Sequence, residues 1–332
     1  MADNVDTGES FTVSRVVREG AAVKFCLPAG VYKDQRLESE SVIIPMKNFH
    51  GGHWFTLCVS SQVGCRMGCT FCQTGMMGLL AQLTSEQILQ QLRTARELLR
   101  ADAGGDLPVP DIRNIVFMGM GEPLDNFSAV TQAIAAICAP GEFNIPLSRI
   151  TVSTVGRVDG IRKLAAMNWP SLRLAISLTA ATDALRSTLM PINKAVPLAE
   201  LRQALLDYPR SRRTRFLIEY VMLNGVNDSP ADAENLAKWC QGLPVTVNLI
   251  AYNPQTPVRF SPSNSETIVA FLQHLRGLGI LAKRRATIGQ PLMAACGQLG
   301  NPELRRRSVS ASGGPQSYFQ ESPAIVVRNV PR

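Results

Sequence analysis

The middle of this 332-residue chain alternates strand-like and helix-like segments, and this alternation restricts its possible folds more than any other feature. A strand-like segment at 55–60 precedes a helix-like segment at 85–99, which has apolar residues along one face and a capping signal from Thr84 to Gln87. Further strand–helix pairs lie at 113–118 with 128–138, 149–153 with 157–166, 172–178 with 198–208, 215–222 with 230–239 and 245–251 with 265–278, before a last apolar segment at 281–288.

Strands that alternate with helices predict an α/β fold with a parallel sheet. Several of the strand-like segments are apolar on both faces, as expected where helices cover the sheet. Roughly six strand–helix units fit either an open sheet or a partial barrel, and hydrophobic periodicity does not choose between them.

The two ends of the chain differ from this middle. Residues 1–54 contain two short strand-like stretches, at 23–27 and 41–45, and we interpret them as an N-terminal extension of a core at 55–300. Residues 301–332 carry three consecutive arginines at 305–307 and continue as a Ser/Gly/Pro-rich tail. That composition predicts a basic, disordered tail.

Composition narrows the class of protein. A hydrophobic content of 45% allows a large core, and a net charge of +8 is mild evidence for a polyanionic partner. No run of about 18 apolar residues appears, and the polar, acidic N-terminus lacks the pattern of a signal peptide. We therefore expect a cytoplasmic protein without a membrane partner. Eight cysteines in such a chain argue for metal binding or catalysis rather than a disulfide framework.

Polar residues follow the predicted strands at one edge of the sheet. A cysteine-rich loop follows the first strand, Glu122 follows the second, Ser153 and Ser177 end the third and fourth, and Asn253 follows the sixth. Ligands bind at the carboxyl ends of parallel strands, so these positions predict the active-site rim.

The strongest chemical signal is the spacing of Cys65, Cys69 and Cys72. A structural zinc site takes four protein ligands, and no obvious fourth ligand lies close by, since the nearest candidates upstream are His50, His53 and Cys58. Three thiolates suit a [4Fe–4S] cluster whose fourth iron stays open to a small molecule. Zinc, or buried thiols without a metal, are the remaining alternatives.

The C-x3-C-x2-C motif after a first strand resembles the radical SAM superfamily. That resemblance implies a partial (βα)6 TIM-like barrel, with S-adenosylmethionine (SAM) bound through its amino and carboxylate groups to the open iron and its adenine near Phe71. Five strings narrow the resemblance to the RlmN/Cfr family of RNA methyltransferases, over about Glu40 to Gly300. They are TLCVSSQVGC at 56–65, MGMGEPLDN at 118–126, MPINK at 190–194, EYVML at 219–223 and AACGQL at 294–299.

The resemblance implies a reaction and its residues. One SAM methylates Cys296, and a second is cleaved at the cluster to a 5′-deoxyadenosyl radical that takes a hydrogen from this methyl group. The methylene radical adds to an adenine carbon, carbon 2 in preference to carbon 8, of 23S rRNA, tRNA or both. Cys58 then forms a transient disulfide with Cys296 to release the RNA, and Glu40 removes the ring proton. An electron donor such as flavodoxin or ferredoxin is implied. The implied SAM contacts are Gly121, Glu122, Ser153, Ser177, Leu178, Thr179 and Asn253.

The chain departs from the family pattern in three places. Thr179 stands where the family has histidine, and 290–293 replaces acidic residues before the AAC string. Only 39 residues precede Glu40, so we expect a member without the usual helical accessory domain. Three basic runs could contact RNA phosphates instead: Arg210, Arg212, Arg213 and Arg215; Lys283, Arg284 and Arg285; and Arg305, Arg306 and Arg307.

Two other functions stay open at this point. One is a radical SAM enzyme of the same ancestry that acts on a different, possibly non-RNA substrate. The other is a non-catalytic iron–sulfur or zinc protein that binds RNA. We interpret Cys26, Cys138 and Cys240 as ordinary buried thiols, and His274 as a helix-surface residue.

Overall fold

The structure is a computed structural model that describes residues 13–48, 50–102, 111–255, 258–285, 297–301 and 304. Its main sheet has ten strands in the order β1-β2-β3-β4-β7-β8-β9-β10-β11-β12. These strands are β1 (Arg15–Glu19), β2 (Ala22–Tyr32), β3 (Gln35–Lys47), β4 (His53–Cys58), β7 (Ile112–Phe117), β8 (Ile150–Thr154), β9 (Arg173–Ser177), β10 (Phe216–Met222), β11 (Val245–Ala251) and β12 (Ala282–Arg284).

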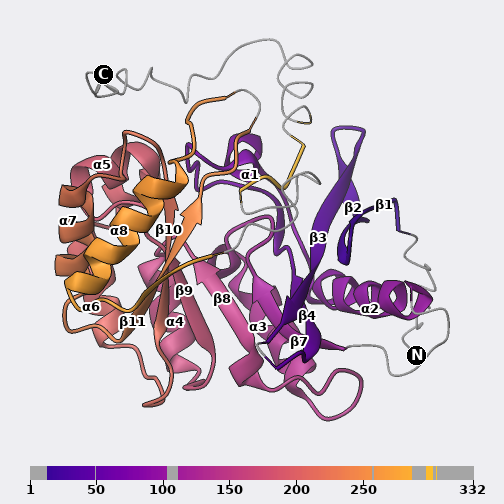
Figure 1. Cartoon of the computed structure of the whole chain (residues 1–332). Helices are drawn as coiled ribbons and strands as arrows, with labels where there is room; N and C mark the ends of the chain where they lie inside the picture. Colours follow the sequence, from indigo (N-terminus) through magenta and orange to yellow (C-terminus); the bar gives the residue numbers. More distant parts are fainter. Residues whose placement is uncertain are drawn as a thin grey trace, which may run out of the picture.

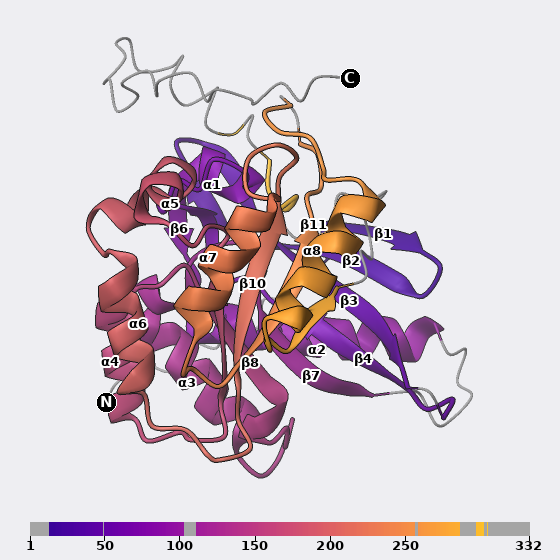
Figure 2. The ribbon, with the colours of Figure 1, turned by 60° about the vertical axis from the view of Figure 1, so that its left-hand side comes forward.

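Within this main sheet the strands from β4 to β12 all run parallel, which confirms the predicted α/β fold with a parallel sheet. The helices lie around the outside of the curved sheet (Figures 1 and 2). Within the described residues the edge strands β1 and β12 do not pair, so the barrel is open. The helices of this layer are α2 (Ser85–Asp102), α3 (Phe127–Cys138), α4 (Val158–Ala166), α6 (Leu198–Leu206), α7 (Pro230–Cys240) and α8 (Ser265–Gly277).

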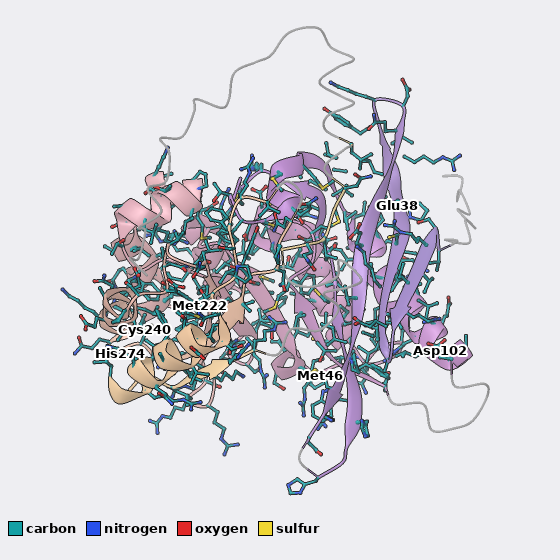
Figure 3. The ribbon with its side chains drawn as sticks, turned by 45° about the horizontal axis from the view of Figure 1, so that its top comes forward. Glu38, Met46, Asp102, Met222, Cys240 and His274 are labelled. Atoms are coloured by element: carbon teal, nitrogen blue, oxygen red, sulfur yellow. The ribbon has the colours of Figure 1, made fainter. Side chains whose placement is uncertain are left out.

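The N-terminal strands extend the same sheet. Strands β2 and β3 form a long antiparallel hairpin, and β3 pairs antiparallel with β4. Both strands are longer than the stretches predicted at 23–27 and 41–45, and β1 was not predicted. Figure 3 shows the hairpin projecting beside the barrel, with Glu38 on β3. Most of β2 is buried, because this hairpin covers an edge that the six-unit core would leave open.

Short elements near the cysteine loop were also missed from the sequence. They are β5 (Gln62–Cys65), α1 (Gln73–Met77), β6 (Gly78–Gln82) and α5 (Asp183–Leu189). Segments of four to seven residues do not show enough of a period to be recognised, whereas the long periodic helices were predicted to within a few residues. None of the helices in the described ranges is long and apolar enough to span a lipid bilayer.

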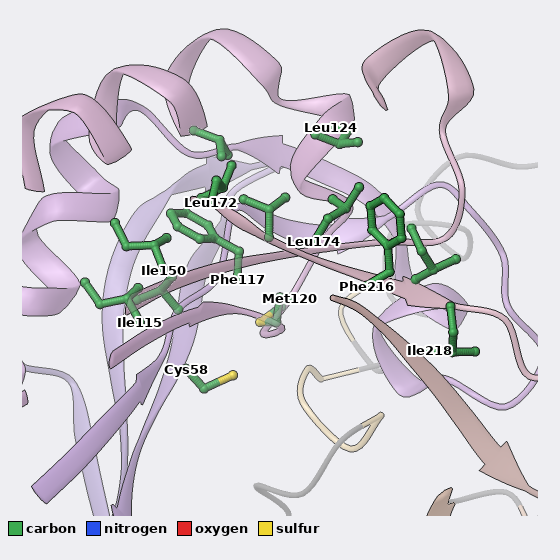
Figure 4. Close-up of a cluster of buried hydrophobic side chains, with 14 of the residues drawn as sticks. Cys58, Ile115, Phe117, Met120, Leu124, Ile150, Leu172, Leu174, Phe216 and Ile218 are labelled. Atoms are coloured by element: carbon green, nitrogen blue, oxygen red, sulfur yellow. The ribbon is translucent and has the colours of Figure 1, made fainter. Parts of the chain in front are cut away.

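Apolar side chains from the parallel strands fill one continuous core. Figure 4 shows Ile115, Phe117, Ile150 and Leu174 packed together, with Cys58 at the margin of the cluster. These side chains lie on the strands that carry the predicted rim. The core therefore fixes where each strand ends and where each rim residue lies.

A buried amide joins this core to the hairpin. Gln91 of α2 is fully buried, and its Oε1 accepts from Ser41 Oγ at 2.6 Å and from Ser60 N at 2.8 Å. Its Nε2 donates to Ser60 O at 3.0 Å. Gln91 thereby satisfies both backbone polar groups of Ser60, just beyond the end of β4.

We predict that Gln91→Leu lowers the free energy of unfolding by about 2–4 kcal/mol, because the buried N–H and C=O of Ser60 lose their partners. Chemical denaturation measures the change. The matched control is Gln90→Leu on the same helix, where the amide donates only to Thr94 at 3.4 Å. An equal loss in both variants would show that the Gln91 contacts carry no special stability.

Candidate functional site

A compact loop carries the three clustered cysteines beyond β4. Strand β5 ends at Cys65 and pairs with β6, and α1 begins directly after Cys72. Gly64 has a φ of +74°, and a Cβ there would lie 1.8 Å from the carbonyl oxygen of Gly78. Only glycine permits this close approach. The fold of the loop brings all three cysteines to the wall of one pocket.

The thiols of Cys65 and Cys69 are buried, and burial raises the pKa of each well above its ordinary value. A bound iron atom reverses this, because the metal holds the thiolate form. Among the described residues, no group of three His, Cys, Asp or Glu side chains is arranged to chelate a single metal ion. A four-iron cluster binds each cysteine to a different iron, so its ligands need not converge on one point.

The pocket contains about 1040 Å³ of empty space, part of it open to solvent. Predicted residues that line it are Cys65, Cys69, Cys72, Gly121, Glu122, Ser153, Ser177 and Thr179. Predicted residues that do not line it are Leu178 and Asn253, both buried, and Cys58 and Glu40, which lie on β4 and β3. The carboxyl ends of the parallel strands thus bring most of the expected SAM contacts to the cysteine loop.

Glu122 is fixed by the backbone around it. Its Oε1 accepts from Leu124 N at 3.1 Å and its Oε2 from Val155 N at 2.9 Å, so the carboxylate joins the loops after β7 and β8. Burial raises its pKa to about 7, and the hydrogen bonds that it accepts oppose this rise. Gly121 beside it has a φ of +103°, and a Cβ there would lie 2.6 Å from Gln62. Only glycine therefore fits at this position of the pocket wall.

Thr179 has a backbone conformation that β-branched residues rarely adopt, with a φ of +59°. Asn227 holds it, because its Nδ2 donates to Thr179 O at 2.7 Å. The Thr179 hydroxyl is fully buried and has no hydrogen-bond partner among the described residues. A strained residue with an unused hydroxyl in the pocket wall is suited to contact a ligand.

Sequence reasoning missed Arg186 of α5, which is 1% exposed. Its guanidinium donates to Val155 O at 2.6 Å, Ser177 O at 3.3 Å and Leu178 O at 3.2 Å. Burial lowers its pKa to about 10, and the nearby Cys69 opposes this. Arg186 thus joins the ends of β8 and β9 beside the cysteine loop. The only signal was the neighbouring MPINK string, which had been given no role.

Glu219 and Arg285 also line the pocket, and neither was predicted to do so. Glu219 belongs to the EYVML string, which had no assigned chemistry, and Arg285 to a run interpreted as a phosphate contact. Within that run, the Lys283 and Arg284 side chains are exposed. In the other described run, Arg215 donates to Val245 O at 2.8 Å. The run at 305–307 lies outside the described residues.

Residues 297–300 dock against the cysteine loop. Gly297 O accepts from Gln73 N, the residue after Cys72, at 2.8 Å, and from Gln255 Nε2 at 2.8 Å. Thr74 Oγ1 donates to Leu299 O at 2.6 Å. Gly297 and Leu299 both line the pocket. Cys296 and the departure at 290–293 lie outside the described residues, but the residue after Cys296 is bonded to the cysteine loop.

Glu40 lies at the other side of this docked segment. Its Oε2 accepts from Lys24 Nζ at 2.7 Å and from Gly300 N at 3.2 Å.

Cys58 is buried at the end of β4, and no disulfide joins cysteines of the described part of the chain. Cys26 and Cys240 are buried, and Cys138 is half-buried. Figure 3 places Cys240 and His274 in the helical layer.

The Radical SAM superfamily profile matches residues 59–240. A protein of Protochlamydia amoebophila named "Probable dual-specificity RNA methyltransferase RlmN 1" is 46% identical over 271 residues, covering 82% of this chain and 72% of its own length. A Sorangium cellulosum protein named "Dual-specificity RNA methyltransferase RlmN" is 43% identical, with 76% of this chain and 64% of its own length covered. The chain belongs to the RlmN family of the radical SAM superfamily.

The crystal structure of a radical SAM methyltransferase from Sphaerobacter thermophilus is also similar, with a TM-score of 0.77 and 38% identity over 87% of this chain and 80% of that one. The predicted radical SAM fold and the family are therefore confirmed, and the chain is a radical SAM methyltransferase. Its family uses a [4Fe–4S] cluster and SAM. Membership of this methyltransferase family argues against the alternative of a non-catalytic iron–sulfur or zinc protein that binds RNA.

The cofactors fit the pocket of this RlmN-family chain. Three cysteines at its wall match the ligand set of a cluster with one open iron. An unpartnered, buried oxygen of Thr179 lies in the pocket wall, where a small-molecule cofactor would complete it.

We predict that the unfolding free energy of the cluster-free protein falls as pH rises from about 5 to 7, because the raised pKa of Glu122 favours the protonated form in the folded state. The contribution is complete below the ordinary pKa near 4.5 and is lost as pH passes about 7. Urea denaturation at several pH values measures it. Glu122→Gln should flatten this dependence, and an unchanged slope in the variant would contradict the assignment.

Proposed function

We propose that this chain methylates a carbon of adenine in RNA, in 23S rRNA, tRNA or both, through an S-methylcysteine at Cys296. Carbon 2 is the proposed target rather than carbon 8. The names of the RlmN relatives, the radical SAM fold and the net charge of +8 support RNA as the substrate. A flavodoxin or ferredoxin is the proposed electron donor.

In this proposal Cys65, Cys69 and Cys72 hold the cluster. The SAM contacts are assigned to Gly121, Glu122, Ser153, Ser177, Leu178, Thr179 and Asn253. When bound, the cluster and SAM supply the radical that removes a hydrogen from a methyl group. Among the residues of the chain, Glu122 and Arg186 keep the strand ends in place around these groups.

The docking of residues 297–299 is the observation that supports this function best. The hydrogen bond from Gln73 N to Gly297 O holds the residue after Cys296 against the residue after Cys72. Gln255 reinforces the arrangement, because its Nε2 donates both to Gly297 O and to Phe71 O. A methyl carrier at Cys296 must approach the site of SAM cleavage closely, and this anchor holds its neighbour at the pocket wall.

Cys58 and Glu40 complete the proposed set. Cys58 would attack the sulfur of Cys296, so that a disulfide forms while the bond between this sulfur and the carbon joined to adenine breaks. The electron pair of the broken bond stays with that carbon, which takes up a proton to become the methyl group, and the step needs an accessible second thiol. Glu40 would accept the ring proton. Its carboxylate is bonded to Gly300 N, next to the pocket-lining Leu299, and Lys24 holds it in place through their ion pair.

The test of the function is anaerobic incubation of the cluster-loaded protein with reductant, methyl-labelled SAM and separate pools of rRNA and tRNA. We expect label in 2-methyladenosine, detected by nucleoside mass spectrometry, and the pool that responds identifies the substrate. Label that stops at Cys296 would instead favour a radical SAM enzyme of the same ancestry with another substrate. Label at carbon 8 would correct the position.

We predict that Cys296→Ala abolishes RNA methylation, because the methyl carrier is lost. The same assay measures it, with Cys240→Ala as the control, since Cys240 is buried in the helical layer away from the pocket. Methylation that persists in Cys296→Ala would rule out the S-methylcysteine route.

We predict that Cys58→Ala accumulates a covalent protein–RNA adduct, because the thiol that releases the product is missing. Denaturing gel electrophoresis with labelled RNA detects the adduct. Cys138→Ala, on the half-buried end of α3, should accumulate none. Normal turnover without an adduct in Cys58→Ala would remove Cys58 from the mechanism.

A further inference from the structure

Glu219 is a buried carboxylate in the middle of β10 that faces the pocket. It is 5% exposed and pairs in register with Ser177 of β9 and Asn248 of β11. Its Oε1 accepts from Asn248 Nδ2 at 2.7 Å. Its Oε2 has no hydrogen-bond donor among the described residues. One oxygen is therefore used to fix the side chain, and the other remains available at the pocket wall.

Arg285 follows β12 and places a guanidinium beside this oxygen. Its backbone N donates to Leu249 O at 2.9 Å, which fixes where the residue leaves the sheet. Its Nη1 lies 3.6 Å from Glu219 Oε2 and 3.6 Å from Met118 Sδ. The first distance is that of an ion pair and is too long for a hydrogen bond. An acceptor and a donor thus lie side by side in the same wall.

A buried carboxylate oxygen without a donor costs free energy, and native proteins rarely keep one unless a ligand or ordered water completes it. The ligand must offer a donor to Glu219. Next to that donor it can offer an acceptor to Arg285. The pocket-lining Met118, Ile250 and Tyr252 are apolar or aromatic, which suits a flat ring.

We propose that Glu219 and Arg285 bind the Watson–Crick edge of the target adenine, with Glu219 Oε2 accepting from the exocyclic amine and Arg285 donating to ring nitrogen 1. This rests on the proposed function and deepens it. Adenine presents an amine donor next to a ring acceptor, whereas guanine presents an acceptor next to an N–H donor. Guanine would therefore place an acceptor oxygen against the acceptor Glu219 and an N–H donor against the donor Arg285. Cytosine shares adenine's pattern, but its carbon 2 is a carbonyl.

The same contact bears on which carbon reacts. Carbon 2 is bonded to nitrogen 1, and carbon 8 belongs to the other ring. A guanidinium that donates to nitrogen 1 withdraws electron density from carbon 2, which makes this carbon a better acceptor for a carbon-centred radical. Arg285 would thus both recognise the base and favour methylation at carbon 2.

The test uses the RNA that the wild-type enzyme methylates, prepared with either adenine or unsubstituted purine at the target position. Purine lacks the exocyclic amine. We expect the wild-type enzyme to lose about tenfold or more in kcat/KM on purine. Glu219→Gln should show a similar loss on adenine and little further loss on purine. Glu234→Gln on the exposed surface of α7 is the matched control and should keep the wild-type ratio.

Formation of 5′-deoxyadenosine and methylation of Cys296 should be unchanged in Glu219→Gln, which also shows that the variant is folded. A fall in SAM affinity with an unchanged adenine-to-purine ratio would overturn the proposal and make Glu219 a contact of SAM. An unchanged ratio with unchanged SAM binding would overturn it as well.

A second variant keeps the test independent of Glu219. Arg285 is 30% exposed in its side chain, so Arg285→Gln should fold. On RNA with 1-deazaadenine, which replaces nitrogen 1 by carbon, the wild-type enzyme should slow, and Arg285→Gln should show no further loss. Equal further losses in both enzymes would overturn the role of Arg285. Absence of RNA methylation by the wild-type enzyme would instead refute the proposed function, and this assignment with it.

Discussion

Buried polar side chains that bond from one strand end to the next hold the active-site rim together. The carboxyl ends of parallel strands leave backbone groups that the sheet no longer pairs, and in a dry interior each needs a partner. Gln62 Oε1 accepts from Glu122 N, Glu122 accepts from Val155 N, and Arg186 donates to Val155 O and Ser177 O. Asn227 continues the series by donating to Thr179 O. The positions of Glu122, Ser177 and Thr179, three of the proposed ligand contacts, depend on this series of bonds.

Much of the fold could be predicted from hydrophobic period alone. Helix α2 was expected at 85–99 and ends at Asp102, and β11 was expected at 245–251, where it lies. The cysteine loop and its position after the first strand followed from local spacing. These features can be predicted because a hydrophobic period or a motif involves only residues that lie close together in the sequence.

The parts of the site that could not be predicted depend on contacts between distant segments. Gly300 N donates a hydrogen bond to the Glu40 carboxylate, although the two residues lie 260 positions apart in the sequence. The Thr74 hydroxyl donates to Leu299 O, 225 positions away. Arg285 looked like one member of a surface run, yet the parallel register of β12 with β11 turns it into the pocket while Lys283 and Arg284 stay exposed. Glu219 looked like part of a strand, and only the register with Asn248 shows that its carboxylate is held from one side.

Two groups of side chains with different chemistry line the pocket, and this difference matters for the proposed radical chemistry. The cysteine loop holds soft, buried thiols next to Phe71 and the docked Gly297. The Glu219 and Arg285 pair, with apolar neighbours, also lines the pocket. In the proposed reaction a reactive radical must meet its partner before it meets another group, so the carrier segment has to be held in place while the substrate ring is bound. Residues 297–299 are tied to the cysteine loop by a backbone bond from Gln73 N to Gly297 O and by the Thr74 hydroxyl, which donates to Leu299 O. In the proposed reaction, recognition of the base rests on the Glu219 and Arg285 side chains, so substrate choice can vary within this fold while the cysteine loop stays the same.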